Sequence, residues 1–177
     1  MRILLAFLLL ACPAFAADYV NSYWDGTSGH ESAAEIGGYN DNIQVVLTNA
    51  ETYYQVTGLA VDFGYSTGGT FITTGSNAIE IEANGAGLYK GVLSASFAAS
   101  GAGEYHCEVH KESVDTERLA FRRKIANAND YGSATGSGLL PGLVNEDTLT
   151  IWCKSDTDTR TLTFDHLSLN VIRIGGP

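Results

Sequence analysis

The feature that most constrains the fold is a two-residue alternation of apolar and polar side chains, which recurs in short segments along the chain. The segment Tyr105–His110, for example, alternates an apolar residue with histidine or glutamate. A period of two is typical of β-strands with one buried face, and no longer segment repeats apolar residues at helical spacing. The alternating segments are Leu59–Phe63, Ile79–Glu82, Gly87–Ser100, Glu104–Lys111, Leu119–Ile125, Leu149–Lys154 and Leu167–Val171.

Glycine, asparagine, aspartate and serine separate these segments, as expected for turns between strands. The sequence therefore predicts an all-β fold, a two-sheet antiparallel sandwich of the jelly-roll type. With 177 residues, 45% of them hydrophobic, the chain has enough apolar material for one core.

The charge balance excludes some partners. The chain has 20 Asp and Glu against 10 Lys and Arg, a formal net charge of −10. Duplex nucleic acid needs cationic side chains to neutralise its phosphates, so we expect no nucleic-acid partner. The hydrophobic content also excludes a disordered acidic tail.

The N-terminus has the features of a secretory signal peptide, which we assign to residues 1–16. One positive charge precedes the apolar run Ile3–Ala11, and Ala14-Phe15-Ala16 provides small residues at a cleavage site before Ala17. The run is shorter than the roughly 18–20 residues that span a bilayer, so we expect no stable transmembrane anchor. Two alternatives stay open, namely a lipid on Cys12 and an uncleaved N-terminus that packs inside an assembly.

Two further regions follow the signal peptide. Residues 17–42 are rich in Gly, Ser, Asn and Asp without a sustained period, which predicts an irregular lead-in or stalk. Residues 43–177 form the predicted jelly-roll domain.

The order of segments from Thr52 to Ile174 resembles a known superfamily. Gly87–Phe97 is similar to the glycine-aromatic strand of complement globular heads and tumour-necrosis-factor-like jelly rolls, and Glu104–Lys111 to the next strand. Ser137–Ile151 looks like their element of two apolar strands joined by an acidic turn, and Leu162–Ile174 like their last strand. The superfamily usually has Gly-Asp before its penultimate group of strands, and this chain has Glu146-Asp147 there. Similar jelly rolls occur in phage fibre heads and spore filaments, so the fold alone does not select a function.

The resemblance implies a trimer in which one sheet packs against neighbouring subunits. It places Gly87–Ser100, Thr148–Lys154 and Leu162–Ile174 in this inner sheet, and Glu104–Lys111 in the outer one. An exposed apolar patch on one sheet usually marks an interface, whereas scattered surface hydrophobic residues do not. The interface residues that we expect, from their non-core positions, are Leu88, Val92, Trp152, Phe164 and Ile172.

Cys107 and Cys153 both fall on predicted core faces, and an exported chain favours a disulfide between them. The resemblance puts them in opposite sheets, so this bridge would cross the sandwich. Sheets stack about 10 Å apart, whereas a disulfide needs Cα atoms within about 7 Å. Two buried free thiols are therefore the alternative.

Two groups of residues are weak candidates for metal binding. His106 and Glu108 lie on one strand face with His110, but the two histidines are about 13 Å apart and cannot share an ion without a bulge. A solvated polar face is the simpler interpretation. Asp156 and Asp158 offer oxygens to calcium, or else belong to a hairpin turn. We expect no other cofactor.

Arg122, Arg123 and Lys124 form the basic run of the chain and are candidates for contact with an anionic ligand. Charged residues that protect a strand edge from aggregation explain the run equally well.

The sequence favours a non-enzymatic function. It contains no Gly-x-Ser-x-Gly, His-Glu-x-x-His or phosphate-binding loop. We predict an exported trimeric module, secreted, extracellular or periplasmic, that attaches to a glycan or protein surface. The alternative is a phage or virus structural protein such as a fibre head, spike or capsid decoration at the virion surface. A carbohydrate-active sandwich enzyme is a third hypothesis.

Overall fold

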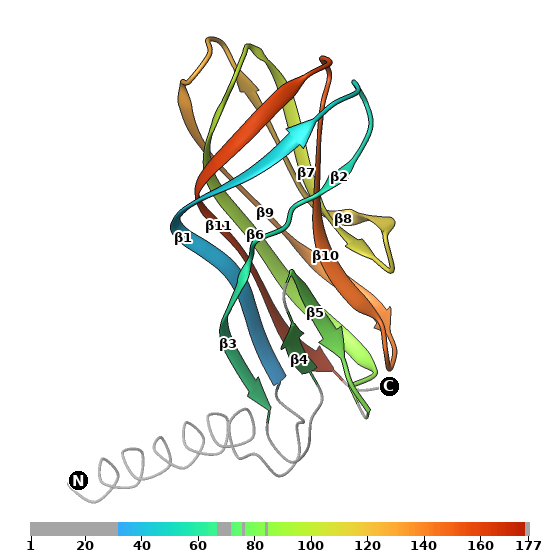
Figure 1. The fold of residues 1–177 in the computed structure, drawn as a ribbon. Coiled ribbons are helices and arrows are strands. Elements are labelled where there is room, and N and C mark those ends of the chain that lie inside the picture. Colours follow the sequence, from blue (N-terminus) through green and yellow to red (C-terminus); the bar gives the residue numbers. More distant parts are fainter. Residues whose placement is uncertain (1–31, 67–71, 76, 84, 176–177) are drawn as a thin grey trace, which may run out of the picture.

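A computed structural model describes residues 32–66, 72–75, 77–83 and 85–175, and they form an all-β sandwich (Figure 1). The strands are β1 (Ser32–Leu47), β2 (Tyr54–Gln55), β3 (Ala60–Ser66), β4 (Ile72–Gly75), β5 (Ala78–Ile81), β6 (Gly87–Ala99), β7 (Gly103–Lys111), β8 (Val114–Ile125), β9 (Tyr131–Leu143), β10 (Thr148–Ser155) and β11 (Arg160–Gly175). The jelly-roll sandwich that the sequence predicts is confirmed.

The strands form two antiparallel sheets. Sheet A has the order β3-β1-β11-β6-β9, and sheet B has the order β4-β5-β10-β7-β8 with β2 paired to β10. The first and last long strands, β1 and β11, pair along most of their length, so strands from both ends of the chain lie side by side in sheet A. Most neighbours in each sheet are distant in sequence, as in other jelly rolls.

The core lies between the sheets and is built from every second residue of each strand. Phe97 of β6 lies at its centre, with ring centroids 6.3 Å from Tyr105 and 5.6 Å from Phe164. All three side chains are fully or almost fully buried. Each such side chain stabilises the fold by about 1.5–3 kcal/mol through the removal of apolar surface from water. The aromatic contacts therefore join sheet A to sheet B through Tyr105.

The structure corrects the predicted start of the domain. β1 begins at Ser32, inside the segment 17–42 that the sequence predicts as irregular. Its first half, Ser32–Asn42, contains two adjacent glycines and a register shift between Tyr39 and Ile43, so its alternation is interrupted. Pairing with β11 and β3 nevertheless makes it a strand. The predicted signal peptide, residues 1–16, and residues 17–31 lie outside the described residues.

The structure also corrects the sheet to which one strand was assigned. Thr148–Lys154, in β10, pairs with β7 in sheet B and not with β6 and β11 in sheet A. The alternation within a strand shows which of its residues face the core, but both sheets face the same core. Parity alone therefore gives no information on the choice of sheet.

Glycines in β9 allow one edge of sheet A to approach sheet B. A Cβ atom on Gly136 would lie 2.2 Å from the backbone oxygen of Ala120, and one on Gly138 would lie 2.1 Å from that of Arg118. Real Cβ atoms do not approach backbone oxygens this closely, so a side chain at either position would push β9 away from β8. The two glycines close the sandwich on this side.

We predict that Gly136→Ala destabilises the protein by about 1–3 kcal/mol, the usual cost of overpacking. The methyl group meets a backbone carbonyl, which cannot rotate away as a side chain can. Urea unfolding monitored by circular dichroism measures the change. Ser137→Ala, at the next and exposed position, is the matched control and should change the free energy of unfolding by less than about 0.5 kcal/mol. Equal effects of the two substitutions would contradict the close packing of β9 on β8.

Candidate functional site

The disulfide joins two neighbouring strands of sheet B. Cys107 of β7 and Cys153 of β10 are direct cross-strand partners with Cα atoms 4.1 Å apart, and both are fully buried. This separation matches an antiparallel pair without mutual backbone hydrogen bonds, where Cα atoms lie about 4.5 Å apart. The predicted pairing of the cysteines is confirmed. The prediction that the bridge crosses the sandwich is wrong, because β10 belongs to sheet B.

The outer face of sheet A carries exposed apolar side chains at one end. Ile172 of β11 and Leu139 of β9 are 52% and 48% exposed, and both are cross-strand neighbours of Lys90 on β6. Leu88 and Val92 lie on the same face of β6 and are half-buried. Three of the predicted interface residues, Leu88, Val92 and Ile172, therefore share this face. We refer to the face as the Ile172 face.

The other two predicted interface residues lie elsewhere. Phe164 is 1% exposed and packs in the core, because a register shift between Phe164 and His166 reverses the alternation of β11 at this point. Trp152 points outward as predicted, but from sheet B. Its ring stacks on His110 with centroids 5.0 Å apart, and its indole N–H donates to the Thr150 hydroxyl.

The basic run does not form one patch. Arg122 and Lys124 are exposed on the outer face of β8, and Arg122 lies 3.8 Å from the Glu104 carboxylate. Arg123 has the opposite parity and donates a hydrogen bond from Nη1 to the backbone oxygen of Ser133 on β9. Arg123 therefore links the edges of the two sheets, and two cations are left at the surface for a ligand.

Asp156 and Asp158 stabilise the turn between β10 and β11. Asp156 accepts hydrogen bonds from the Glu104 backbone N–H and the Thr157 hydroxyl, and Asp158 accepts one from the Ala50 backbone N–H. The bond from the Glu104 backbone is the main cause of a lowered pKa at Asp156. These contacts support the hairpin-turn interpretation of the two aspartates.

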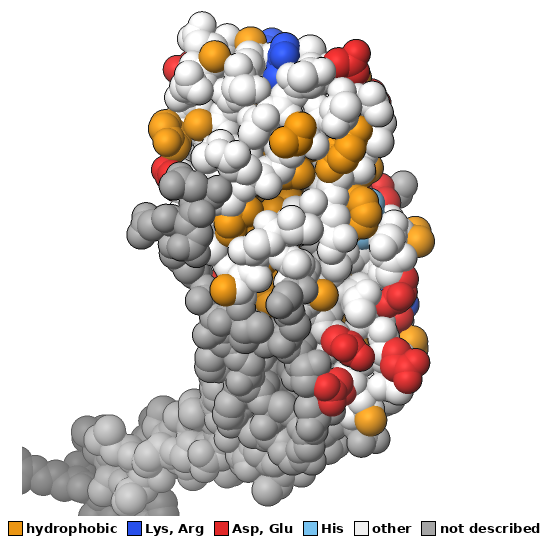
Figure 2. Space-filling view, in the orientation of Figure 1, with side chains coloured by type: hydrophobic (Ala, Val, Ile, Leu, Met, Phe, Trp, Pro, Cys, Tyr) orange, Lys and Arg blue, Asp and Glu red, His pale blue; other side chains and the backbone are white. Residues whose placement is uncertain are grey.

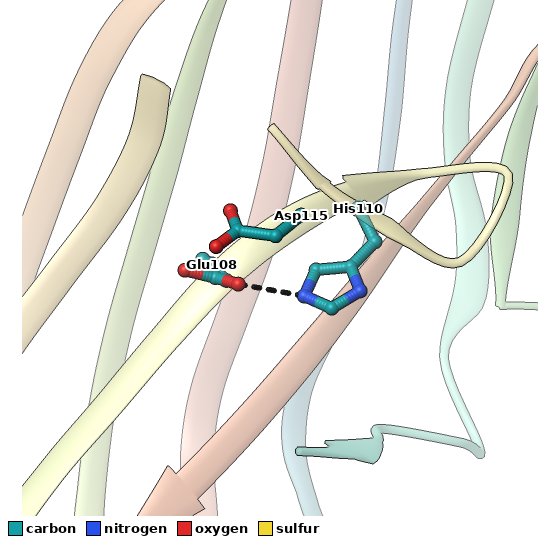
Figure 3. A group of neighbouring side chains, drawn as sticks. All are labelled: Glu108, His110 and Asp115. Carbon is teal, nitrogen blue, oxygen red and sulfur yellow. Dashed lines mark hydrogen bonds and ion pairs between the residues drawn. The ribbon is translucent and has the colours of Figure 1, made fainter. Parts of the chain in front are cut away.

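A cluster of ionisable side chains lies on the outer face of sheet B, next to the β7–β8 hairpin. Glu108 and His110 of β7 and Asp115 of β8 point toward one another, as Figure 3 shows. Atoms of the three side chains that can act as ligands all lie within 4.8 Å of one another. The Nε2 atom of His110 lies 2.7 Å from Oε1 of Glu108. We call these three residues the Glu108 cluster.

A three-residue insertion in β8 brings Asp115 into the cluster. Glu108 pairs with Ala120, and His110 pairs with Asp115. These two pairs are two residues apart on β7 but five residues apart on β8. The Thr116 hydroxyl donates to the backbone oxygen of Val109 within the inserted segment. Paired residues of an antiparallel ladder lie on one face, so the insertion places Asp115 directly beside His110.

Neighbouring aromatic residues cover the cluster. Tyr53, just before β2, places its ring 5.1 Å from that of His110 and its hydroxyl 2.9 Å from Nδ1 of His106. The Trp152 ring stacks on that of His110. Glu108 and His110 are consequently only 2% and 4% exposed. The prediction of a solvated polar face at Glu108 and His110 is therefore wrong. His106 is half-buried, with Nε2 3.5 Å from Glu108.

The electrostatics of the cluster follow from its burial. Desolvation raises the pKa of the Glu108 carboxyl and the Asp115 carboxylate raises it further, although hydrogen bonds from Tyr53 and His110 act in the opposite direction. Desolvation also lowers the pKa of His106, as do the charges of Arg122 and Lys154. Burial and Glu108 raise the pKa of Tyr53, which keeps its phenol neutral.

A depression of about 530 Å³ opens beside the cluster. It is lined by Tyr53, His106, Glu108, Asp115, Ala120, Phe121, Arg122 and Lys154. The alternation in the sequence shows that His106, Glu108 and His110 share a face. The aromatic cover comes from Tyr53 and Trp152 in distant segments, and the alternation does not predict the insertion in β8 that brings in Asp115. The charged residues Lys111, Glu112 and Asp115, which follow His110 within five positions, were the available signal.

Acidic side chains dominate part of the surface. Figure 2 shows them gathered toward the lower right of the side that it draws, with Lys and Arg near the top of that side. This distribution agrees with the net charge of −10. Among the residues that the structure describes, none forms a helix that is long and apolar enough to cross a membrane.

Comparison with solved structures identifies the fold. The vertex protein P5 of PRD1 aligns with a TM-score of 0.52 at 16% identity over 82% of this chain and 99% of its own, and murine APRIL with 0.51 at 13% over 82% and 100%. Eiger, a TNF from S. frugiperda, aligns with 0.51 at 12% over 84% and 96%. The fold is a tumour-necrosis-factor-like jelly roll. The sequence matches no protein-family model and no curated protein, so the likeness is one of fold.

We predict that the chain without residues 1–16 has no free thiol when it is denatured without reductant, because Cys107 and Cys153 are bridged. Thiol titration before and after reduction measures this, and reduction should release two thiols. Replacement of both cysteines by alanine should lower the free energy of unfolding by about 3–4 kcal/mol, since the bridge spans 46 residues. Free thiols in the unreduced protein would contradict the bridge.

We predict that Asp156→Ala lowers the melting temperature by about 2–3 °C at pH 7, through the loss of the bond from the Glu104 backbone. A carboxyl whose pKa is lowered on folding stabilises above its unfolded pKa, and this contribution disappears as the pH falls through the lower, folded value. The difference from wild type should therefore shrink below about pH 4. Glu80→Ala is the exposed control. A difference that appears only when calcium is present would instead indicate a calcium site.

Proposed function

We propose that this chain is an exported, non-enzymatic jelly-roll module that forms a trimer through the Ile172 face and attaches to a glycan or protein surface. The observation that carries the proposal is the exposed apolar end of this face, at Ile172 and Leu139. These two side chains lie on either side of Lys90, and their burial in an interface would remove apolar surface from water. The resemblance to tumour-necrosis-factor-like jelly rolls supports a trimer.

The centre of the same face is suited to close approach by a neighbour. Ser94 and Ser168 lie across β6 and β11 with their hydroxyl oxygens 2.9 Å apart, and His166 lies 3.2 Å from Ser94. The two serine hydroxyls bond one another and Ser94 also lies within hydrogen-bond distance of His166, so a second subunit can cover them without leaving these polar groups unpaired.

The buried disulfide supports export. Structural disulfides form and persist in oxidising compartments, which include the periplasm, the extracellular space and the surface of virions. The predicted signal peptide leads to the same location. We expect ligands to bind at loops and subunit boundaries, with Arg122 and Lys124 available for an anionic group because both are exposed on β8.

A structural role in a virion is the second candidate. The observation that favours it is the similarity of fold to a protein described as a vertex protein. Both candidates rely on assembly and binding without turnover, and they differ in the fate of the N-terminus. Intact mass spectrometry of native material separates them, since secretion predicts a mature chain beginning at Ala17 and the virion role predicts Met1 within a large particle. Hydrolysis on a glycan panel would instead favour the enzyme hypothesis.

We predict that light scattering gives a mass three times that of one chain and that Ile172→Asp converts the trimer to monomer. A carboxylate at this position would have to lose its water in the interface, a cost that the neighbouring Lys90 would not repay. Val114→Asp is the matched control, because Val114 is 66% exposed on sheet B. It should leave the mass unchanged. A monomeric wild type, or dissociation by Val114→Asp alone, would overturn the proposed interface.

A further inference from the structure

The Glu108 cluster brings two carboxylates and one imidazole to a single point without a lysine or arginine between them. Glu108 and His110 are more than nine-tenths buried, and their nearest atoms lie 2.7 Å apart (Figure 3). Asp115 is exposed at the edge of the group, with a carboxylate oxygen within 4.8 Å of the ligand atoms of Glu108 and His110. The three residues come from one face of one hairpin.

The hydrogen bonds of His110 fix its tautomer. Its Nδ1 lies 3.2 Å from the backbone oxygen of Ser113, which can only accept a hydrogen bond, so Nδ1 carries a proton. In a neutral imidazole, Nε2 is then an acceptor and faces an oxygen of Glu108, which is also an acceptor when ionised. Contact at 2.7 Å therefore has a proton between the two atoms, because this separation is that of a hydrogen bond.

A metal ion satisfies the site better than a proton. One proton leaves one negative charge on the two carboxylates, of which Glu108 is buried, whereas a divalent cation balances both. An Nδ1–H bonded to a backbone carbonyl is the usual outer contact of a metal-binding histidine, because it orients the ring and leaves Nε2 to bind the ion. Tetrahedral zinc with bonds of 2.0–2.2 Å separates its ligand atoms by about 3.4 Å. This value lies between the 2.7 Å of the Glu108–His110 contact and the 4.8 Å within which all three groups fall, so Glu108 and His110 move slightly apart when the ion replaces the proton.

The surroundings also suit an ion. Glu108 and Asp115 line the depression of about 530 Å³, which gives access from solvent and room for a water molecule as a further ligand. The cations of the rim are held by other carboxylates, Lys154 by Glu51 at 2.8 Å and Arg122 by Glu104 at 3.8 Å. A nitrogen ligand with two oxygens disfavours calcium and magnesium, which prefer oxygen alone.

We propose that Glu108, His110 and Asp115 bind one divalent transition-metal ion of the zinc type, with a fourth position open to the depression. The ion takes the place of the proton between Glu108 and His110, which leaves to solvent as the metal–nitrogen and metal–oxygen bonds form. The site lies on sheet B, away from the Ile172 face, and does not depend on the trimer.

Calorimetric titration of the untagged, chelator-treated mature chain with zinc chloride tests the proposal. We expect one ion per chain, with a heat that varies with the ionisation enthalpy of the buffer because a proton is released. His110→Gln should weaken binding at least 100-fold. Asp115→Asn, at an exposed position, should weaken it at least 10-fold. His166→Gln, at the half-buried histidine of sheet A, should leave the affinity unchanged.

Fluorescence gives a second measurement that a general surface effect would not produce. Because Trp152 stacks on His110, cobalt(II) bound at the site should quench its emission. The quenching should disappear in Trp152→Phe, although zinc still binds this variant, and in Asp115→Asn. The proposal is overturned if zinc does not bind, if His110→Gln and Asp115→Asn both bind it as wild type does, or if calcium binds as tightly as zinc.

Discussion

Each strand of the sandwich buries every second side chain, and the fold depends on where this alternation continues and where a bulge interrupts it. A shift of one residue moves all later side chains of a strand to the opposite face. The register shift in β11 sends Phe164 into the core, against Phe97, while Ile172 beyond it stays outside. The insertion in β8 does not change the faces of β7, but it changes which residue lies beside His110.

The β7–β8 turn, next to the Glu108 cluster, has a strained backbone. Glu112 and Ser113 both have positive φ, at 51° and 64°, as a two-residue type I′ turn requires. Asparagine and glycine usually occupy such turns, since other residues pay for a left-handed conformation. Here Glu112 accepts hydrogen bonds from the backbone and hydroxyl of Thr148, and the Ser113 carbonyl holds His110. The contacts that hold this turn therefore also orient the histidine of the Glu108 cluster.

Local alternation was sufficient to predict the strands that are regular, such as β7 and β10, and the burial of Cys107 and Cys153. It was insufficient for β1 and β9, where glycines interrupt the pattern. In β9, Gly136 and Gly138 are needed for the close approach to β8, a reason that no local pattern reveals. The sheet that contains β10 follows from its pairing with β7, and the burial of His110 depends on Tyr53 and Trp152, which come from other parts of the chain. Non-local packing decides such features.

The disulfide links β7 to β10 on the core face, while Glu108 and His110 of the Glu108 cluster lie on the outer face of the same strand β7. The bridge fixes Cys107 opposite Cys153, and this register sets Trp152 opposite Glu108 one residue away. Trp152 in that position covers His110. The covalent link on the core face therefore determines the aromatic cover on the outer face, since a slip of β10 along β7 would need the bridge to break. One register of β7 and β10 therefore places both the disulfide and the aromatic cover of the buried cluster. The Ile172 face depends instead on the register of β6, β9 and β11.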